Sequence, residues 1–394
     1  MMGQVPAPPL YSHRELQIRT QYCLSYGLQD MSFQMGKDRY LAGSITSGNS
    51  ASDESNFVFD PNGLTVLTYS PSTGNSYNVY EQFSCIDAIR IVWYACNRQD
   101  TLHFTRMTEQ GAILSQFRMP GYGIGGMFAD TLGKVFCFLK SGSGSGMARF
   151  SSNGTMDFLR WTNVLLPLAA PNLVKYEADG RFYLKTLGNW LVMDRNGNAL
   201  KLLSPPAGYD LTAVYPDHGI AATKAVGGWL RVVRMDSNLV PIWRRAMRVA
   251  NSLNGADSLV QAVDGMVVPH TKELVLACEA RDLISFSSPC WPPQGWNMRV
   301  FVIGDDGIAR QKRGLSSYYA NERLRDLSTS PYGQPLLTTF DNSCFGPAYH
   351  DVAAQCRALS LVELSPECFA NYRFQVGPNY NTFTVGAGSL GALP

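Results

Sequence analysis

The chain has 394 residues, of which 45% are hydrophobic and 11% aromatic, which is enough for a large core and excludes collagen-like, mucin-like and intrinsically disordered chains. Charged residues make up 16%, with 36 Gly and 22 Pro, and this favours an all-β fold because helical surfaces are usually built from Glu, Lys and Arg. The net charge of +2 supplies no global attraction to a polyanion, so we expect no nucleic acid partner.

The chain starts with a Pro-rich segment, MMGQVPAPPL, that lacks the basic and apolar regions of a secretory signal. No run of 18 apolar residues follows, so we expect neither export nor a membrane span. Residues 1–21 are predicted to form an N-terminal arm or a ring-closing segment, residues 22–380 a repeat domain and residues 381–394 a C-terminal tail. We expect the protein in the virion if it is viral, and in the cytoplasm otherwise.

A β-hairpin pattern recurs seven times along the chain. Each copy has two runs of alternating apolar and polar residues around a tight turn, usually with Asn-Gly or Asp-Gly. The copies span residues 56–69, 102–117, 147–161, 190–203, 230–243, 299–312 and, most weakly, 357–372. Their turn positions are separated by 48, 43, 43, 42, 68 and 59 residues, which indicates a period near 43 with two insertions.

A second apolar run precedes every hairpin, and a third run precedes several of these. The second runs begin near residues 39, 89, 134, 181, 220, 273 and 335. Units of about four strands bury both sheet faces only by stacking, and a closed ring leaves no exposed end unit. We therefore predict a β-propeller of about seven four-stranded blades, with six to eight possible and a pair of β-sandwich domains as the alternative. Residues 316–327 are predicted to form a short helix or a linker strand.

Three insertions lengthen the connection between the second and third strands of a unit, at residues 46–55, 281–297 and 341–355. Propeller topology places all three on one face, and binding residues are common on loops held by a rigid scaffold. The second insertion combines stiff prolines with Trp291 and Trp296, and the third carries Phe345 and Tyr349. We predict these four residues as a binding surface for a protein or a sugar ring, because ordered aromatics lose little entropy on contact. The alternative is a loop that plugs the channel or caps a blade edge.

Two hairpins, MARFSSNGTMDFLRW and RVVRMDSNLVPIWRRA, resemble the delta-60-like propeller repeats of bacteria and phages. Their shared pattern is an apolar run, Arg or Lys, an apolar residue, a turn and an apolar, aromatic strand. The resemblance implies a binding or scaffolding propeller without a catalytic set. With its Pro-rich start and its Gly-Ser-rich end, VGAGSLGALP, the chain also resembles a bacteriophage tail structural protein, which implies other virion or assembly proteins, or a host-surface glycan, as partners.

The residues that carry chemistry do not group into a site in the sequence. The stretch from Gly121 to Gly126 matches G-x-G-x-x-G, but no helix follows to hold a pyrophosphate, so we interpret it as a flexible connection between blades. The histidines are too far apart for a local metal site, namely His13, His103, His218, His270 and His350. We expect no cofactor, no metal and no catalysis. The alternative is a carbohydrate-active or lactonase-like enzyme with acids or metal ligands in the channel.

Two further features have competing interpretations. Arg244, Arg245 and Arg248 form a basic patch or protect an edge strand from pairing with another sheet, and edge protection is the favoured interpretation. Cysteines spaced 11 or 12 apart are expected to be reduced, although they could face each other across hairpins: Cys85 with Cys96, Cys278 with Cys290 and Cys344 with Cys356.

Overall fold

The structure of the chain is a computed structural model. It describes residues 14–19, 28–35, 40–47, 55–59, 65–69, 79–98, 100–130, 132–142, 144–164, 174–176, 180–186, 189–249, 259–281, 296–315, 322–329, 335–344, 355–363, 373–376, 383–386 and 391–392.

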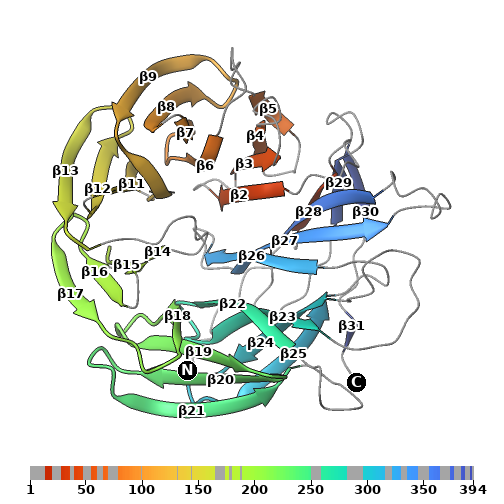
Figure 1. The fold of residues 1–394 in the computed structure, drawn as a ribbon. Helices are drawn as coiled ribbons and strands as arrows, with labels where there is room; N and C mark the ends of the chain where they lie inside the picture. Colours follow the sequence, from red (N-terminus) through yellow and green to blue (C-terminus); the bar gives the residue numbers. More distant parts are fainter. Residues whose placement is uncertain are drawn as a thin grey trace, which may run out of the picture.

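The described strands form seven sheets around a central axis, six of them antiparallel and the seventh mixed, which is the predicted seven-bladed β-propeller (Figure 1). Blade 1 consists of β2 (Leu28–Met35), β3 (Leu41–Ser47), β4 (Ser55–Phe59) and β5 (Thr65–Tyr69). Blade 2 consists of β6 (Val79–Ile86), β7 (Ile91–Arg98), β8 (Thr101–Thr108) and β9 (Ile113–Pro120). Blade 3 consists of β10 (Gly123–Ala129), β11 (Lys134–Ser141), β12 (Gly144–Ser151) and β13 (Met156–Thr162).

Blade 4 consists of β14 (Val174–Tyr176), β15 (Phe182–Lys185), β16 (Trp190–Met193) and β17 (Ala199–Leu203). Blade 5 consists of β18 (Asp210–Val214), β19 (Ile220–Val226), β20 (Trp229–Met235) and β21 (Pro241–Arg248). Blade 6 consists of β22 (Leu259–Val267), β23 (Leu274–Arg281), β24 (Trp296–Ile303) and β25 (Ala309–Leu315), and blade 7 of β26 (Glu322–Thr329), β27 (Pro335–Cys344) and β28 (Gln355–Glu363) with strands from both ends of the chain. The first strand of each blade lies toward the centre and the fourth on the outside (Figure 1).

The N-terminal strand completes the last blade. β1 (Arg14–Arg19) pairs antiparallel with β28 and serves as the fourth strand of blade 7. β29 (Arg373–Val376) then pairs parallel with β1, and β30 (Phe383–Gly386) pairs with β29. β31 (Gly391–Ala392) pairs with the outer edge of β25 in blade 6. The sheet of blade 7 therefore joins strands from the two ends of the chain by hydrogen bonds.

Six of the seven predicted hairpins are confirmed as the third and fourth strands of blades 1 to 6. The seventh, over residues 357–372, is wrong, because β28 pairs with β1 instead of with a strand that follows it. The segment predicted as a helix or a linker strand supplies β26, the first strand of blade 7, while residues 316–321 lie outside the described residues. The Gly-rich stretch predicted as a flexible connection enters β10, so that part of the interpretation is also wrong.

The core lies between the blades, where neighbouring sheets pack face to face. In β11, Val135, Cys137 and Leu139 pack against blade 2, while Phe136 and Phe138 pack against blade 4. Because both faces of such a strand are buried, its sequence is continuously apolar, whereas the outer strand β9 alternates between exposed and half-buried positions. Each fully buried Phe contributes about 2 kcal/mol by leaving water.

The register explains why Cys85 and Cys96 do not pair. Cys85 lies opposite Trp93 and Cys96 opposite Gln82, and the two thiols pack in the clusters on opposite faces of blade 2. Neither cysteine forms a disulfide bond, nor does Cys278, while its predicted neighbour Cys290 lies outside the described residues. In blade 7 the register places Cys344 opposite Gln355, and Cys356 opposite Ser343. No helix with the length and apolarity of a membrane span occurs among the residues that the structure describes.

Candidate functional site

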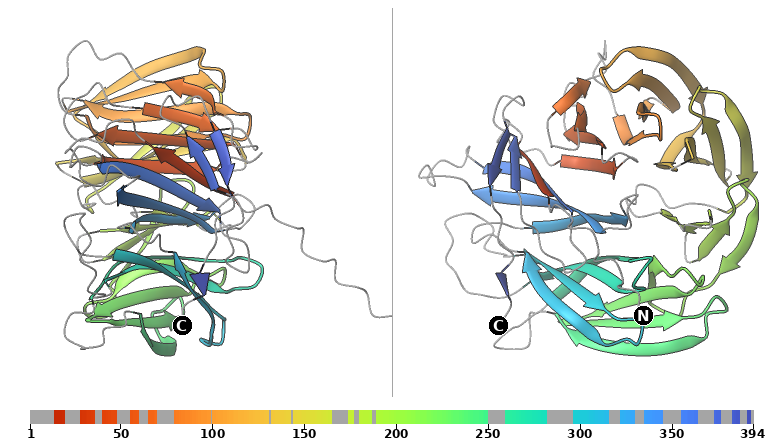
Figure 2. Two further views of the ribbon diagram at one scale, coloured as in Figure 1. Left: turned by 90° about the vertical axis from the view of Figure 1, so that its right-hand side faces the viewer. Right: turned by 180° about the vertical axis from the view of Figure 1, so that it is seen from behind.

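The two faces of the ring carry different connections (Figure 2). The turns from the first to the second strand and from the third to the fourth strand lie on one face, which we call the turn face. The connections from the second to the third strand, and from one blade to the next, lie on the opposite face, which we call the loop face. A ligand or a partner that approaches the ring along its axis therefore meets either the turns or the connections between second and third strands.

The three predicted insertions all belong to the loop face. They connect β3 to β4, β23 to β24 and β27 to β28, in blades 1, 6 and 7, which follow one another around the ring (Figure 1). Of the predicted site residues, Trp296 begins β24 opposite Arg281. Trp291, Phe345 and Tyr349 lie outside the described residues. The structure thus brings the strand ends of the three insertions to one side of the ring, and the four site residues stay a prediction.

On the turn face, an arginine of the third strand bridges neighbouring blades at three junctions. Arg106, Arg149 and Arg234 each stand five residues before the turn position of their own hairpin. Each guanidinium donates to a backbone carbonyl oxygen in the turn of the next blade, and the distances from Arg149 and Arg234 are both 3.1 Å. The acceptors stand two residues before the turn position of that blade and are Ser152, Arg195 and Asp305.

The junction between blades 4 and 5 has a different donor. Val192 occupies the arginine position of blade 4 and is buried in the core between the two blades. Lys201 of the outer strand β17 donates instead, and its Nζ lies 2.9 Å from the carbonyl oxygen of Ser237 in the turn of blade 5. Ser237 stands two residues before Leu239, which is the turn residue with positive φ in that blade. The carbonyl oxygen two residues before the turn position is therefore bound at this junction too, but by a side chain of the fourth strand instead of the third.

The turn glycines pack against the preceding blade as well as adopting positive φ. A Cβ atom on Gly197, whose φ is +78°, would lie 2.8 Å from Cε2 of Phe158. A Cβ atom on Gly307 would lie 2.8 Å from Cδ2 of Trp243. The indole Nε1 of Trp243 also donates to the carbonyl oxygen of Asp305 at 3.0 Å. Glycine is thus required at these turns by backbone conformation and by the close approach of an aromatic side chain of the preceding blade.

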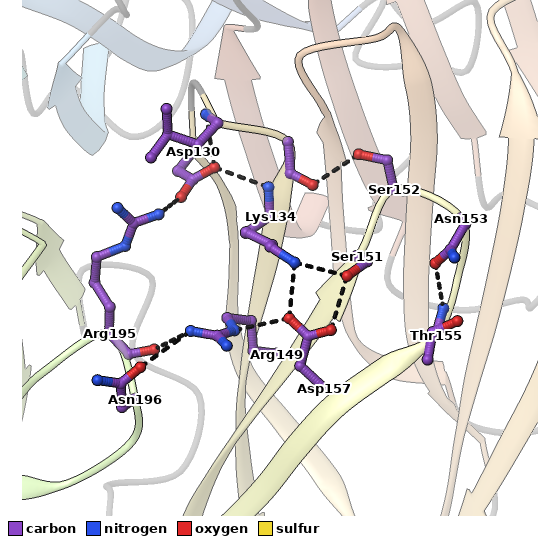
Figure 3. Close-up of polar contacts among 12 residues, drawn as sticks. Asp130, Lys134, Arg149, Ser151, Ser152, Asn153, Thr155, Asp157, Arg195 and Asn196 are labelled. Atoms are coloured by element: carbon purple, nitrogen blue, oxygen red, sulfur yellow. Dashed lines mark hydrogen bonds and ion pairs between the residues drawn. The ribbon is translucent and has the colours of Figure 1, made fainter.

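Around Arg149 the bridge extends into a larger polar network (Figure 3). The carboxylate of Asp157 accepts hydrogen bonds from Ser151 Oγ at 2.7 Å, Lys134 Nζ at 2.9 Å and Arg149 Nε at 2.9 Å. Burial alone would raise the pKa of Asp157, but these hydrogen bonds and the charge of Lys134 hold it below its ordinary value. In blade 4, Arg195 donates in turn to Asp130 of blade 3. The network therefore joins two blades in both directions.

These arginines were not predicted as functional residues, although the hairpins that carry two of them were noted for an Arg near the turn. The local signal is an arginine five residues before the turn position. Its partner belongs to the next repeat, 46 residues further along the chain for Arg106 and Arg149 and 71 residues for Arg234. The hairpin pattern predicts the position of the side chain but not that contact.

Exposed aromatic side chains occur at the loop-face ends of two other blades. Trp161, near the end of β13, stacks on Tyr122 with ring centroids 5.0 Å apart and is 41% exposed. Trp229 begins β20 and is 48% exposed. It is paired with Arg248 of β21 and with Val226 of β19, which is 41% exposed. Neither tryptophan is among the site residues predicted from the sequence.

The carboxylates of the inner strands were the features expected to distinguish an enzyme from a binding module. Asp264 of β22 and Glu279 of β23 are buried and accept hydrogen bonds from backbone amides of β26, from Leu327 at 2.8 Å and Leu324 at 2.6 Å. They therefore bind blade 7 to blade 6. Among the described residues, no three His, Cys, Asp or Glu side chains lie together in a metal-binding group.

The histidines of the described strands and turns occupy separate places. His103 is half-buried in β8, and its pKa is lowered by burial and by the nearby charges of Arg98 and Arg118. His218 lies in the turn between β18 and β19, where its φ is +64°.

The arginines of the predicted basic patch, Arg244, Arg245 and Arg248, are exposed on the outer strand β21. Nε of Arg245 donates to the carbonyl oxygen of Gly307 in blade 6 at 2.8 Å.

No protein-family model matches the chain, so the resemblance of its hairpins to delta-60-like repeats stays a prediction. No curated protein matches the sequence either. The chain is similar in structure to the Pan2 WD40 domain of Neurospora crassa, at 10% identity and a TM-score of 0.50, over 87% of this chain and 91% of that one.

Two other solved propeller structures are similar at lower scores. The Dos1 propeller is 12% identical with a TM-score of 0.49, over 86% of this chain and 78% of that one. Virginiamycin B lyase from Staphylococcus aureus is 10% identical with a TM-score of 0.46, over 85% of this chain and all of that one. At such identities the likeness concerns the fold, and the chain is a β-propeller.

Proposed function

We propose that the protein is a non-catalytic binding propeller that docks to other proteins through its loop face. One observation carries the proposal: the long connections between second and third strands belong to three consecutive blades and start and end on one face. A scaffold with rigid blades and elaborated loops on one face is the usual arrangement of a binding surface. The bridges on the turn face support it, because they fix neighbouring blades relative to one another.

The partners that we propose are other proteins of a viral tail or baseplate, or a glycan of the host surface. This narrower assignment rests on the sequence features alone, namely the delta-60-like hairpins and the composition of the two ends of the chain. Trp291, Trp296, Phe345 and Tyr349 are the proposed contact residues. Tryptophan and tyrosine are frequent among the residues that dominate the binding energy of protein interfaces.

The test measures binding of the full chain to purified products of the neighbouring genes by biolayer interferometry. We expect Trp291→Ala with Trp296→Ala, and Phe345→Ala with Tyr349→Ala, to weaken binding of one such protein at least tenfold. The matched control is Ile89→Ala with Leu132→Ala, two apolar side chains of the turn face that are 65% and 71% exposed. Equal affinity of the wild type and both loop variants, or an equal loss in the control, would contradict the proposal.

A further inference from the structure

Blade 5 carries six cations and no carboxylate on its three outer strands. Lys224 lies on β19, Arg231 and Arg234 on β20, and the remaining three arginines on β21. The chain as a whole has nearly equal numbers of acidic and basic residues, 31 and 33. The concentration of positive charge on one sheet is therefore a local feature that the net charge does not reveal.

The alternation of side chains divides these six cations between the two faces of the sheet. Arg234 and Arg245 point toward blade 6, where they bind Asp305 and the backbone of Gly307. The other four share the face of Ala222 and Val233, which pack against blade 4. They are Lys224, Arg231, Arg244 and Arg248.

The register arranges this second face in three rows across the strands. The row nearest the turn face contains Ala222, Val233 and Arg244; the middle row contains Lys224, Arg231 and Ala246; and the row nearest the loop face contains Val226, Trp229 and Arg248. Adjacent rows are about 7 Å apart and adjacent strands about 5 Å apart, so the cations and the indole occupy an area of about 14 by 10 Å. We call these nine residues the blade 5 patch.

Blade 4 does not cover the middle row of the patch or the row nearest the loop face. Its strands β15, β16 and β17 have 4, 4 and 5 residues, whereas β19, β20 and β21 have 7, 7 and 8. The core between these blades includes Ala222 and Val233 but not the rows below them. Arg231 and Arg248 are consequently exposed, and Trp229 is 48% exposed.

Edge protection does not account for the patch. Cations on the outermost strand discourage pairing with another sheet, and this explanation suits Arg244 and Arg248 of β21. Lys224 and Arg231 lie on the second and third strands, whose two edges are both paired within the blade. Lys224 Nζ lies 3.4 Å from the carbonyl oxygen of Ala207, and Arg231 is exposed. Their place on an inner part of the sheet points to a ligand.

We propose that the blade 5 patch binds a short acidic oligosaccharide, which carries carboxylate or sulfate groups. Guanidinium groups bind such anions through two parallel hydrogen bonds, and the indole of Trp229 offers an apolar surface for the C–H face of a sugar ring. An acidic sugar unit carries both an anionic group and an apolar ring face. The patch offers partners for both, because cations occupy all three rows and the indole lies in the row nearest the loop face. Single-stranded nucleic acid sites instead stack successive bases on several aromatic side chains, and this patch has one.

The proposal does not depend on the loop-face insertions, which are unchanged in the variants that test it. The wild-type chain is titrated with a sulfated heparin octasaccharide, an octagalacturonate and neutral maltooctaose, each at 50 and 200 mM NaCl. We expect at least one acidic octasaccharide to bind at least tenfold more tightly than maltooctaose, and more weakly at the higher salt concentration because salt screens the cations.

The variants Arg231→Ser and Arg244→Ser are expected to weaken this binding at least fivefold each and to reduce its salt dependence. Trp229→Ala is expected to weaken it at least fivefold with an unchanged salt dependence, because the indole carries no charge. Arg160→Ser, an exposed arginine of the outer strand β13, is the matched control with expected wild-type affinity. Urea unfolding midpoints equal to that of the wild type show that each variant is folded.

Three results would overturn the proposal. The first is that neither acidic octasaccharide binds better than maltooctaose. The second is that Arg160→Ser weakens binding as much as Arg231→Ser. The third is that the oligonucleotide dT12 or a poly-glutamate peptide binds more tightly than both acidic sugars and shows the same sensitivity to Arg231→Ser and Trp229→Ala.

Discussion

The guanidinium of Arg234 in blade 5 donates to the backbone carbonyl oxygen of Asp305 in the turn of blade 6, at a distance of 3.1 Å. The same guanidinium donates to the carboxylates of Asp305 and, at 2.7 Å, of Asp217 in its own blade. Its side chain is 6% exposed and lies over the ring of Tyr215 at 4.2 Å. One side chain thus fixes a junction between two sheets.

Arg234→Met is expected to lower the free energy of unfolding by about 3 kcal/mol, because it removes the charged hydrogen bonds of a buried guanidinium to Asp217 and Asp305. The measurement is urea unfolding followed by intrinsic fluorescence. Arg160→Met replaces an exposed arginine and is expected to change stability by less than about 0.5 kcal/mol. Similar losses in both variants would show that Arg234 does not stabilise the junction.

Gly197→Ala is expected to destabilise the protein by about 3 kcal/mol, of which about 1 reflects positive φ and the rest the close approach to Phe158. Gly121 has the same φ of +78°, but a Cβ atom there meets nothing within 4 Å. Gly121→Ala should therefore cost only about 1 kcal/mol. The difference between the two unfolding midpoints measures the packing of the turn against the preceding blade, and equal losses would contradict it.

Glu279→Ala is expected to release the first strand of blade 7, because it leaves the buried amide of Leu324 without its acceptor at 2.6 Å. Loss of this contact should cost about 2 to 4 kcal/mol locally. Hydrogen exchange followed by mass spectrometry should show faster exchange in β26 than in β10 of blade 3. Uniform protection of both strands in the variant would rule out this role for Glu279.

The stability contributed by Asp157 is expected to depend on pH. Its pKa is lower in the folded protein than in the unfolded chain, so its contribution is fully present above the unfolded pKa of about 4. The contribution is lost as the pH falls through the lower folded pKa. Wild type and Asp157→Asn should therefore differ in melting temperature at pH 6 and converge toward pH 2. Asp210→Asn, whose carboxylate is 69% exposed, is the control, and a pH-independent difference for Asp157→Asn would contradict the assignment.

The hairpin pattern was sufficient to predict six of the third-to-fourth-strand pairs, because alternation and turn residues are local properties of the chain. It misassigned the last hairpin, because β28 finds its partner in β1, more than 300 residues earlier in the sequence. The sequence of a strand does not show which strand, distant along the chain, has an unpaired edge. The pairing of β1 with β28 therefore had to be read from the structure, because the hairpin pattern does not contain it.

The candidate surfaces also depend partly on local sequence and partly on contacts between blades. Their aromatic and basic residues were visible in the sequence, and strand alternation decides which side chains share a sheet face. Whether a face is buried depends on the neighbouring blade: short strands in blade 4 leave Arg231 and Trp229 exposed, while the turn of blade 6 covers Arg234.

By itself, the sequence determined the all-β class, the repeat and most strand pairs, because these depend on residues close together in the chain. Only the tertiary structure decided how the ring closes, which arginines bridge two blades and which cations stay exposed. Each of these depends on contacts between parts of the chain that are distant in sequence: β1 with β28 for ring closure, residues 46 or 71 apart for the arginine bridges, and blade 4 against blade 5 for the exposed cations.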